Sequence, residues 1–449
     1  MPALRTLYDS SVYDPAPVPS HWEATVPVDA ADWRPLEADE SCDVAVIGGG
    51  YTGLSAALHL ARDHGIEVRV LEAGGHVGWG ASGRNGGFCC LPATKMSIAA
   101  MTRRYGAEET KRFFASQVEG VAYTRALIED NDIDAEICGD GVFEVAHRRQ
   151  AFGELQEYGA ALTRLFGIET SLYSKDEFRD IGHDSTEQFG ALKVHAGFAL
   201  HPLKFAHGMA RAASAAGAVL HPSSPVTRWL KDGSHHLLHS ERGMLRAKRV
   251  VVATNGYLRE RLHRAFDARI LPALSNIIVT RPLNAAELAA QSWTTDCPLT
   301  NTRRLLFYYR KLPDARILFG ARGDLSGTPA DGARMRDWMV RRFTEVFPAW
   351  REIPIDYFWR GLICFSRRLA PSLGRLADDP TVHYGFGYHA NGVNTAPWAG
   401  GKIAEMVAGR TEPDDLPAVL RGLPARFPLP TLRRTYLAIA YRWYGLRDG

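Results

Sequence analysis

The hydrophobic pattern near the start of the chain predicts a strand, a helix and a second strand in close succession. Residues 44–47 are a continuous apolar run, which is typical of a strand buried on both faces. Residues 54–61 are rich in helix formers with apolar side chains on one face, and Gly65 ends that helix. Residues 68–71 form a second apolar run, and Glu72 follows at its carboxyl end. The rest of the chain is organised around this unit.

Three glycines at the first turn of this unit, Gly48, Gly50 and Gly53, have the spacing G-x-G-x-x-G. The first permits a tight turn, the second lets a pyrophosphate approach the backbone, and the third lets helix and strand pack closely. Free N–H groups at the helix start would face the phosphates. Glu72 is placed to accept hydrogen bonds from a ribose and would repel a 2′-phosphate, which argues against NADP. The pattern predicts a dinucleotide site; an ordinary glycine turn and another nucleotide fold are the alternatives.

A second glycine-rich segment, residues 77–90, reads V-G-W-G-A-S-G-R-N-G-G-F-C-C. Such a loop can lie flat against a planar cofactor, although its composition alone would also suit a surface loop. Together with the first glycine motif and Glu72, the run G-x-G-A-S-G-R-N-G-G resembles the D-amino-acid-oxidase-like flavoenzymes, which include glycine and sarcosine oxidases. Within that family it is similar to the gamma-glutamylputrescine oxidase branch. The resemblance covers nearly the whole chain and implies FAD as the cofactor.

The resemblance also implies the fold class. We expect an α/β protein in which a Rossmann-like FAD-binding domain joins a second, substrate domain built on an antiparallel sheet. Both are discontinuous in sequence: residues 41–94, 195–265 and 356–410 for the FAD-binding domain, and residues 95–194 and 266–355 for the substrate domain. An N-terminal arm (1–40) and a basic helical tail (411–449) complete the chain.

Periodicity predicts further elements between the glycine loops and the later flavin segments. Two helices are expected over residues 108–115 and 118–131, and another over 150–166. Residues 137–146 are expected to form a pair of strands broken at their glycines. His201 precedes a proline and a helical segment, and the resemblance favours a helix-capping role for it over a catalytic one.

The resemblance implies cofactor contacts in six parts of the chain. The two glycine-rich segments and the strand end between them supply Gly48, Gly50, Tyr51, Thr52, Gly53, Glu72, Ala73, Gly80, Ala81, Ser82, Arg84, Asn85, Gly86 and Gly87. Later segments supply Val226, Ala253, Thr254, Gly387, Asn391, Gly392, Val393 and Asn394. The residues from Gly387 to Asn394 precede and begin a helix whose N-terminus would stabilise the negative charge of reduced flavin. The alternative is a strand–helix junction without a role in cofactor binding. Cys364 lies near the place where some relatives attach flavin covalently but does not align with it, so non-covalent FAD is expected.

The implied reaction is FAD-dependent oxidation of an amine C–N bond to an imine, which hydrolyses to an aldehyde. A gamma-glutamylputrescine-like amine is the expected substrate. Molecular oxygen, which would give peroxide, or another electron acceptor completes the cycle. Asn394 stands where sarcosine-type relatives have a carboxylate-binding lysine, and residues 317–320 lack the lysine that activates oxygen there. His389 is the candidate for a polar substrate contact, and no general base is assigned because an amine that binds neutral needs none.

Other functions fit parts of the same pattern. A sarcosine, N-methyl amino acid or D-amino acid oxidase would share the fold and the cofactor, although Asn394 counts against it. A non-catalytic flavin-binding protein would hold FAD that no amine reduces. An NAD-dependent dehydrogenase would be colourless when purified.

Composition and charge narrow the partners of the chain. Its 449 residues carry a formal net charge of +3, too small to indicate a nucleic-acid partner. No run of 18 apolar residues and no signal-peptide pattern occur, and the six cysteines lack metal-ligand spacing, so a reduced, cytoplasmic protein without a metal is expected. Residues 431–444 predict a basic amphipathic helix that suits an anionic membrane surface, but packing on its own domain is favoured.

Overall fold

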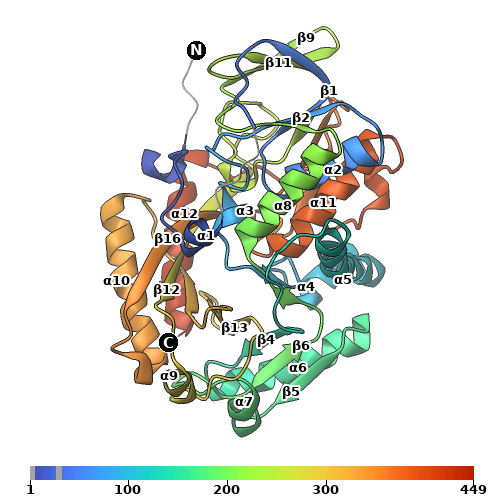
Figure 1. Cartoon of the computed structure of the whole chain (residues 1–449). Helices are drawn as coiled ribbons and strands as arrows, with labels where there is room; N and C mark the ends of the chain where they lie inside the picture. The colour runs from blue at the N-terminus through green and yellow to red at the C-terminus, as the bar shows by residue number, and fades with distance from the viewer. Residues whose placement is uncertain (1–5, 27–32, 449) are drawn as a thin grey trace.

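The protein is described from a computed structural model that covers residues 6–26 and 33–448. Residues 1–5 and 27–32 of the expected N-terminal arm, and residue 449 of the expected tail, lie outside the described residues. The chain forms two eight-stranded sheets and one small two-stranded sheet. The first large sheet lies at the top of Figure 1, and the second lies below it.

The first sheet is mainly parallel and places the glycine-rich turns at one edge. Its order is β17 (Ser372–Arg375), β18 (Val382–Phe386), β11 (Met244–Val252), β1 (Glu40–Ile47), β2 (Val68–Leu71) and β8 (Val219–His221), with β10 (His235–His239) and β9 (Arg228–Asp232) attached to β11. Ile47 pairs in parallel with both Leu71 and Val252, so three strands end side by side. Ligands of open α/β sheets bind at this carboxyl edge.

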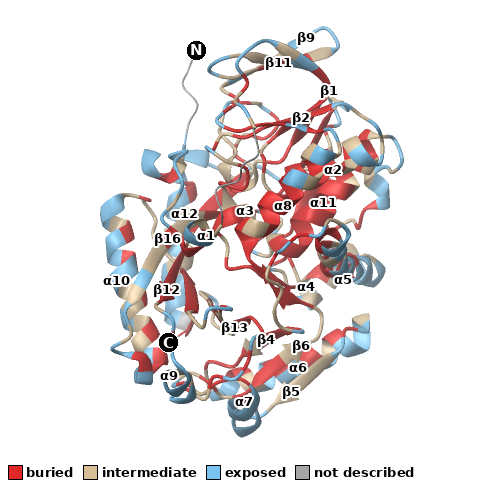
Figure 2. Cartoon of the chain, in the orientation of Figure 1, coloured by how far each residue is buried: buried red, intermediate tan, exposed pale blue. Residues whose placement is uncertain are grey.

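Three helices bury the apolar face of this sheet. They are α2 (Tyr51–Arg62), α8 (Pro202–Ala215) and α11 (Gly392–Val407), and Figure 2 shows that most of their residues are buried. The long helix α5 (Ala107–Asp130) packs against α11. The other helices are α1 (His21–Thr25), α3 (Ala81–Arg84), α4 (Ile98–Tyr105), α6 (Arg149–Phe166), α7 (Lys175–Ile181), α9 (Ala285–Ala289), α10 (Pro329–Val346) and α12 (Arg433–Asp448).

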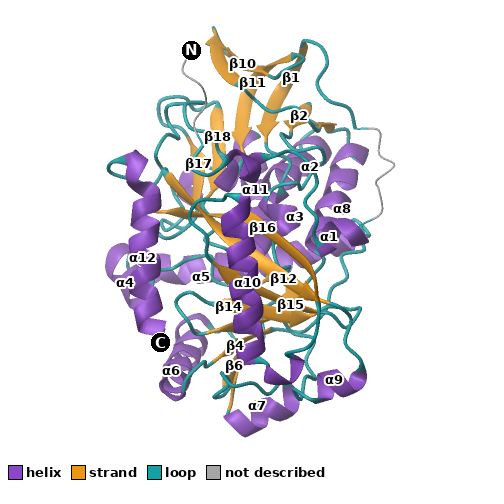
Figure 3. Cartoon of the chain, turned by 90° about the vertical axis from the view of Figure 1, so that its left-hand side faces the viewer, coloured by secondary structure: helices purple, strands orange, loops and turns teal. Residues whose placement is uncertain are grey.

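The second sheet is mostly antiparallel, and the expected α/β class with a second antiparallel sheet is confirmed. Its order is β16 (Ile355–Ser366), β12 (Ile270–Thr280), β15 (Ile317–Arg322), β14 (Phe307–Lys311), β13 (Leu299–Asn301), β4 (Val142–Val145), β6 (Ala191–Val194) and β5 (Thr170–Tyr173). Helix α10 crosses its outer side (Figure 3). The two-stranded sheet joins β3 (Phe88–Cys89) to β7 (Phe198–Ala199).

Strand β16 corrects the expected domain boundary. The sequence assigns residues 356–366 to the FAD-binding domain, whereas β16 pairs along its length with β12 in the second sheet. The chain enters the first sheet only afterwards, at β17. An antiparallel strand with one covered face has an apolar pattern that does not reveal which sheet it joins.

Two local predictions also differ from the structure. One continuous helix, α5, replaces the two helices expected over 108–131, because Ser116 and Gln117 are buried rather than solvated. The Gln117 side chain accepts hydrogen bonds from the Ala93 N–H at 2.8 Å and the Thr395 hydroxyl at 3.1 Å. Of the two strands expected over residues 137–146, only the second forms, as β4. The first is replaced by a single β-bridge at Cys138.

The C-terminal segment is helical, as expected, and packs on the second sheet. Leu437 and Tyr441 of α12 contact Leu271 and Ala273 of β12. Arg433 donates to the Ile270 carbonyl at 2.8 Å. In the described part of the chain, no helix is both long and apolar enough to span a bilayer.

Candidate active site

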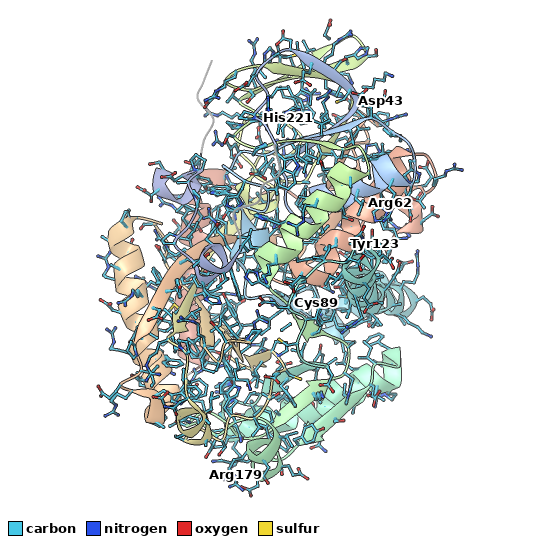
Figure 4. The ribbon with its side chains drawn as sticks, in the orientation of Figure 1. Asp43, Arg62, Cys89, Tyr123, Arg179 and His221 are labelled. Atoms are coloured by element: carbon cyan, nitrogen blue, oxygen red, sulfur yellow. The ribbon has the colours of Figure 1, made fainter. Side chains whose placement is uncertain are left out.

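A cavity runs from the carboxyl edge of the first sheet to the inner face of the second. Eighteen predicted cofactor contacts line it: Gly48, Gly50, Tyr51, Thr52, Glu72, Ala73, Gly80, Ala81, Ser82, Arg84, Asn85, Gly86, Val226, Ala253, Thr254, Asn391, Gly392 and Val393. Gly361 and Tyr308 contribute from the second sheet. Figure 4 shows Cys89 at the centre of the molecule, and its neighbours Phe88 and Cys90 line the cavity.

The turn between β1 and α2 has the close approaches that its glycines predict. Gly48 has a φ of +107°, and a Cβ there would lie 2.9 Å from the Ala253 carbonyl oxygen. A Cβ on Gly53 would lie only 1.9 Å from the Gly48 carbonyl oxygen. The Tyr51 N–H at the start of α2 donates to the Ser82 hydroxyl at 2.9 Å. The two glycine-rich segments therefore meet at the helix N-terminus, where an anion is stabilised.

Glu72 is fixed at the wall of the cavity by backbone donors. Its two carboxylate oxygens accept hydrogen bonds from the N–H groups of Gly49 and Gly74, each at 2.7 Å. Burial raises the pKa of this carboxyl group, and the two N–H groups act in the opposite direction. The carboxylate is held rigidly where the sequence expects a ribose contact.

Two polar atoms on the wall have no hydrogen-bond partner among the described residues, Arg84 Nη2 and Thr254 Oγ1. Arg84 is positioned by its Nε, which donates to the Trp79 carbonyl at 2.7 Å, and by the Trp79 ring, 4.4 Å from the guanidinium carbon. Buried polar groups are costly without partners. These atoms, the glycine turns and the α2 N-terminus fit a long dinucleotide with phosphate and carbonyl oxygens, so the residues present suit FAD.

A second helix N-terminus reaches the same cavity at α11. Asn391 is fixed by its side-chain amide, which donates to the Pro92 carbonyl at 2.7 Å. Gly392 and Val393 follow it and line the cavity. Their N–H groups begin the helix, where the dipole favours negative charge.

Five predicted site residues are not brought to the cavity wall. They are Gly53, Gly87, Gly387, Asn394 and His389. Gly87 is needed for close packing, because a Cβ there would lie 1.9 Å from the Leu200 carbonyl oxygen. Gly387 is held by a hydrogen bond, in which its N–H donates to the Asn255 side chain at 2.9 Å.

Asn394 and His389 point into the protein. Asn394 is fully buried against α5, where its amide donates to the Gln117 carbonyl at 3.4 Å. His389 is fully buried with Nε2 3.3 Å from the Ser366 hydroxyl, and burial lowers its pKa to about 3. The predicted substrate contact from His389 therefore has no geometric support, because its side chain supports the loop from inside.

His201 has the capping role that the sequence favours. Its Nδ1 accepts the Lys204 N–H at 3.2 Å at the start of α8, and its Nε2 lies 2.9 Å from the Thr25 hydroxyl. Burial lowers the pKa of His201 to about 2.

The sequence assigns no site role to several lining residues on the second sheet and its neighbours. The aromatic residues of β14 can line an amine pocket or pack within a sheet, and packing is the favoured interpretation. The structure places Tyr308 of β14, and Arg322 of β15, at the cavity wall. Tyr388, next to the predicted glycine turn, also lines the cavity and bonds to Thr52 at 2.7 Å between hydroxyl oxygens. The described residues contain no group of three or more His, Cys, Asp or Glu side chains suited to a metal ion.

Comparison with known proteins identifies the family. The sequence profile described as FAD dependent oxidoreductase (DAO) matches residues 43–406, most of the chain. The chain belongs to this family. The family resemblance read from the glycine motifs is confirmed, and FAD is the cofactor of this oxidoreductase.

Relatives of this FAD-dependent oxidoreductase match it over nearly its full length. Gamma-glutamylputrescine oxidoreductase of Escherichia coli (strain K12) is 32% identical over 93% of this chain and 95% of its own. The probable oxidoreductase OrdL of Rhizobium meliloti (strain 1021) is 30% identical over 96% and 97%. The crystal structure of glycine oxidase from Geobacillus kaustophilus superposes with a TM-score of 0.69 at 20% identity, covering 83% of this chain and 95% of that one.

Acid precipitation is expected to release all of the flavin from the oxidoreductase. Cys364 lines the cavity, but burial raises the pKa of its thiol to about 12, so the nucleophilic thiolate is scarce. Trichloroacetic acid should leave a white pellet and a yellow supernatant, and the C364S variant should bind the same amount of FAD. A yellow pellet from the wild type, lost in C364S, would show a covalent link.

Proposed function

We propose that this oxidoreductase oxidises the C–N bond of an amine to an imine, which water converts to an aldehyde, and that its substrate is gamma-glutamylputrescine or a related amine. FAD, when bound, accepts the two electrons. Oxygen is the proposed final acceptor and gives peroxide. Six free cysteines in the structure support a reducing location, for which we propose the cytoplasm.

The observation that carries this proposal is the 32% identity, over almost both full lengths, to a gamma-glutamylputrescine oxidoreductase. The cavity agrees with an amine larger than sarcosine, because it extends beyond the nucleotide loops to β12, β14 and β15. Asn394, at the place of the carboxylate-binding lysine of sarcosine-type relatives, bonds to α5 instead of reaching the cavity. An α-carboxylate next to the reacting carbon therefore has no cation at that position.

The protein's own residues prepare the substrate side of the cavity. The Tyr308 and Ser275 hydroxyls bond to each other at 2.9 Å, which fixes the Tyr308 ring at the wall. An aromatic face there can hold the substrate chain and its amine without a buried anion. His389 cannot act as a proton donor at neutral pH, since burial keeps its pKa near 3.

The test is the visible spectrum of the anaerobic protein before and after addition of gamma-glutamylputrescine. We expect the flavin band to bleach, and admitted air to restore it with about one peroxide per flavin. Sarcosine and D-alanine should bleach it far more slowly. Bleaching by those amino acids alone would favour an amino acid oxidase, and a flavin that no amine bleaches would favour a non-catalytic flavin-binding protein.

A further inference from the structure

One face of the second sheet continues from the cavity to Glu144. Thr300 pairs with Glu144 on β4 and with Tyr308 on β14, and Tyr308 pairs with Gly320 on β15. Paired residues project to the same face of a sheet, and Arg322, two residues after Gly320, shares that face. Thr300, Tyr308 and Arg322 all line the cavity. The Glu144 side chain therefore points to the cavity side of the sheet.

Lys95 approaches the same region from the loop after β3. Its N–H donates to the Leu369 carbonyl at 2.9 Å, which fixes the loop. The residue has exposed surface, yet burial lowers the pKa of its ammonium group to about 7, with the Arg322 charge acting in the same direction and Glu144 opposing. The Lys95 ammonium group therefore lies close enough to Arg322 and Glu144 for both charges to act on it.

Within the described residues, these three charged groups have neither a hydrogen-bond partner nor an ion-pair partner. Across residues 6–26 and 33–448, no hydrogen bond or ion pair within 4 Å reaches the Lys95 ammonium, the Glu144 carboxylate or the Arg322 guanidinium. Arg322 lies over the Phe365 ring, 5.4 Å from its centre. Burial raises the pKa of Glu144 to about 7 and lowers that of Arg322. Desolvated charges without partners cost stability, and they are typical of ligand sites.

We propose that Lys95, Glu144 and Arg322, here called the charged trio, bind an α-amino-acid head group that the substrate carries at a distance from its oxidised carbon. The head-group carboxylate lies between Lys95 and Arg322, and its ammonium group meets Glu144. A guanidinium and an ammonium together suit a carboxylate, and each such charged hydrogen bond is strong. This inference rests on the proposed function, because it names the part of the amine that the site selects.

The position of the charged trio separates the head group from the oxidised carbon. The predicted flavin contacts come from the first sheet and the α11 start, which form one side of the cavity. Glu144 and Arg322 belong to the second sheet, which faces that side, and Lys95 lies on the loop that Asn391 holds at Pro92. The substrate class is therefore an amine linked by a flexible chain to an α-amino-carboxylate, rather than an α-amino acid oxidised at its own α-carbon.

The first test is binding of γ-glutamyl-n-butylamide, which has the head group but lacks the distal amine that the proposed reaction oxidises. Calorimetry with the FAD-loaded protein should show binding to the wild type and at least tenfold weaker binding to K95M, E144Q and R322M. R322K should recover part of the loss. The matched control is K311M, because Lys311 lies on the opposite face of β14 and pairs with Asp296 at 2.9 Å. Melting temperatures check that each variant is folded.

The second test compares anaerobic flavin reduction by gamma-glutamylputrescine and by N-acetylputrescine, which has the same amine and a neutral head. The wild type should prefer the first by a hundredfold or more in kcat/KM, and K95M should lose that preference through KM. Equal affinity of all variants for the butylamide, or a wild type that does not bind it, would overturn the charged trio's role. Slower reoxidation by air in K95M, with unchanged binding, would instead make Lys95 an oxygen contact.

The two proposals fail in different ways. If the butylamide binds through the trio but no amine bleaches the flavin, the head-group site stands and the proposed function fails. If both putrescine derivatives bleach the flavin equally well in wild type and variants, the proposed function stands and the head-group site fails.

Discussion

Replacing Gly53 with alanine is expected to give a protein that no longer holds FAD. The added methyl carbon would lie 1.9 Å from the Gly48 carbonyl oxygen and 3.0 Å from a Val46 methyl group. Backbone at that distance has to move, so α2 would shift away from β1 and take the Tyr51 N–H from the phosphate position. Overpacking of this kind costs about 3 kcal/mol of stability, at the upper end of its usual range.

Gly153 provides the matched control for this substitution. It is an exposed glycine inside α6, and a Cβ there would meet nothing within 4 Å. G153A should stabilise the protein by roughly 0.5–1 kcal/mol, because alanine loses less conformational entropy in a helix. Urea unfolding and the ratio of flavin to protein absorbance measure both effects. A G53A protein with full FAD content and an unchanged midpoint would contradict the packing role of this glycine.

Acidification from pH 7.5 to pH 5 is expected to destabilise the protein by roughly 7 kcal/mol. Burial lowers the pKa of five histidines that are at most 2% exposed: His183, His201, His236, His383 and His389. Their pKa values fall to about 4, 2, 4, 4 and 3, respectively. Below pH 6.5 the unfolded imidazoles bind protons that the folded ones cannot, so stability is lost as the pH falls, by about 2 kcal/mol for each at pH 5.

Two buried carboxyl groups act in the opposite direction. Burial raises the pKa of Glu144 to about 7 and also raises that of Glu72, so both favour the folded state as the pH falls below 7. They offset part of the histidine effect but not all of it. Urea unfolding at the two pH values, followed by tryptophan fluorescence, measures the net change.

The variant H183F isolates one histidine. Its ring is stacked on Trp293 with centres 5.1 Å apart, a contact that phenylalanine can keep. The loss of stability between pH 7.5 and pH 5 should be smaller by about 2 kcal/mol in H183F than in the wild type. An identical pH dependence of the two proteins would show that the pKa of His183 is the same in the folded and unfolded states.

The strand–helix–strand unit and its cavity contacts could be predicted because their residues are close together in sequence. Glycine spacing and Glu72 specify backbone geometry directly, and the structure places them at one edge. The prediction of two helices in place of α5 is wrong because glutamine is usually a surface residue. Gln117 is buried here because Ala93 and Thr395, which are distant in sequence, donate hydrogen bonds to it. The orientation of His389 depends on Ser366, which is likewise distant in sequence.

The substrate side could not be predicted in the same way. Glu144 and Arg322 share a face only through the register of β4, β13, β14 and β15. Neither residue has a local motif, and Lys95 lies in an irregular loop. Sheet register is set by long-range pairing, so a single sequence does not reveal which charges meet.

The order of strands in the first sheet has a consequence for how the enzyme is made. β1 pairs with β11 and β11 with β18, so the cofactor edge joins segments near residues 47, 252 and 386. Contacts between such distant segments form slowly during folding. The glycine motif, although it is near the beginning of the chain, lacks its neighbours until almost the whole chain has been synthesised. Flavin uptake should therefore be a late event in biogenesis, and its rate should report the closing of the sheet.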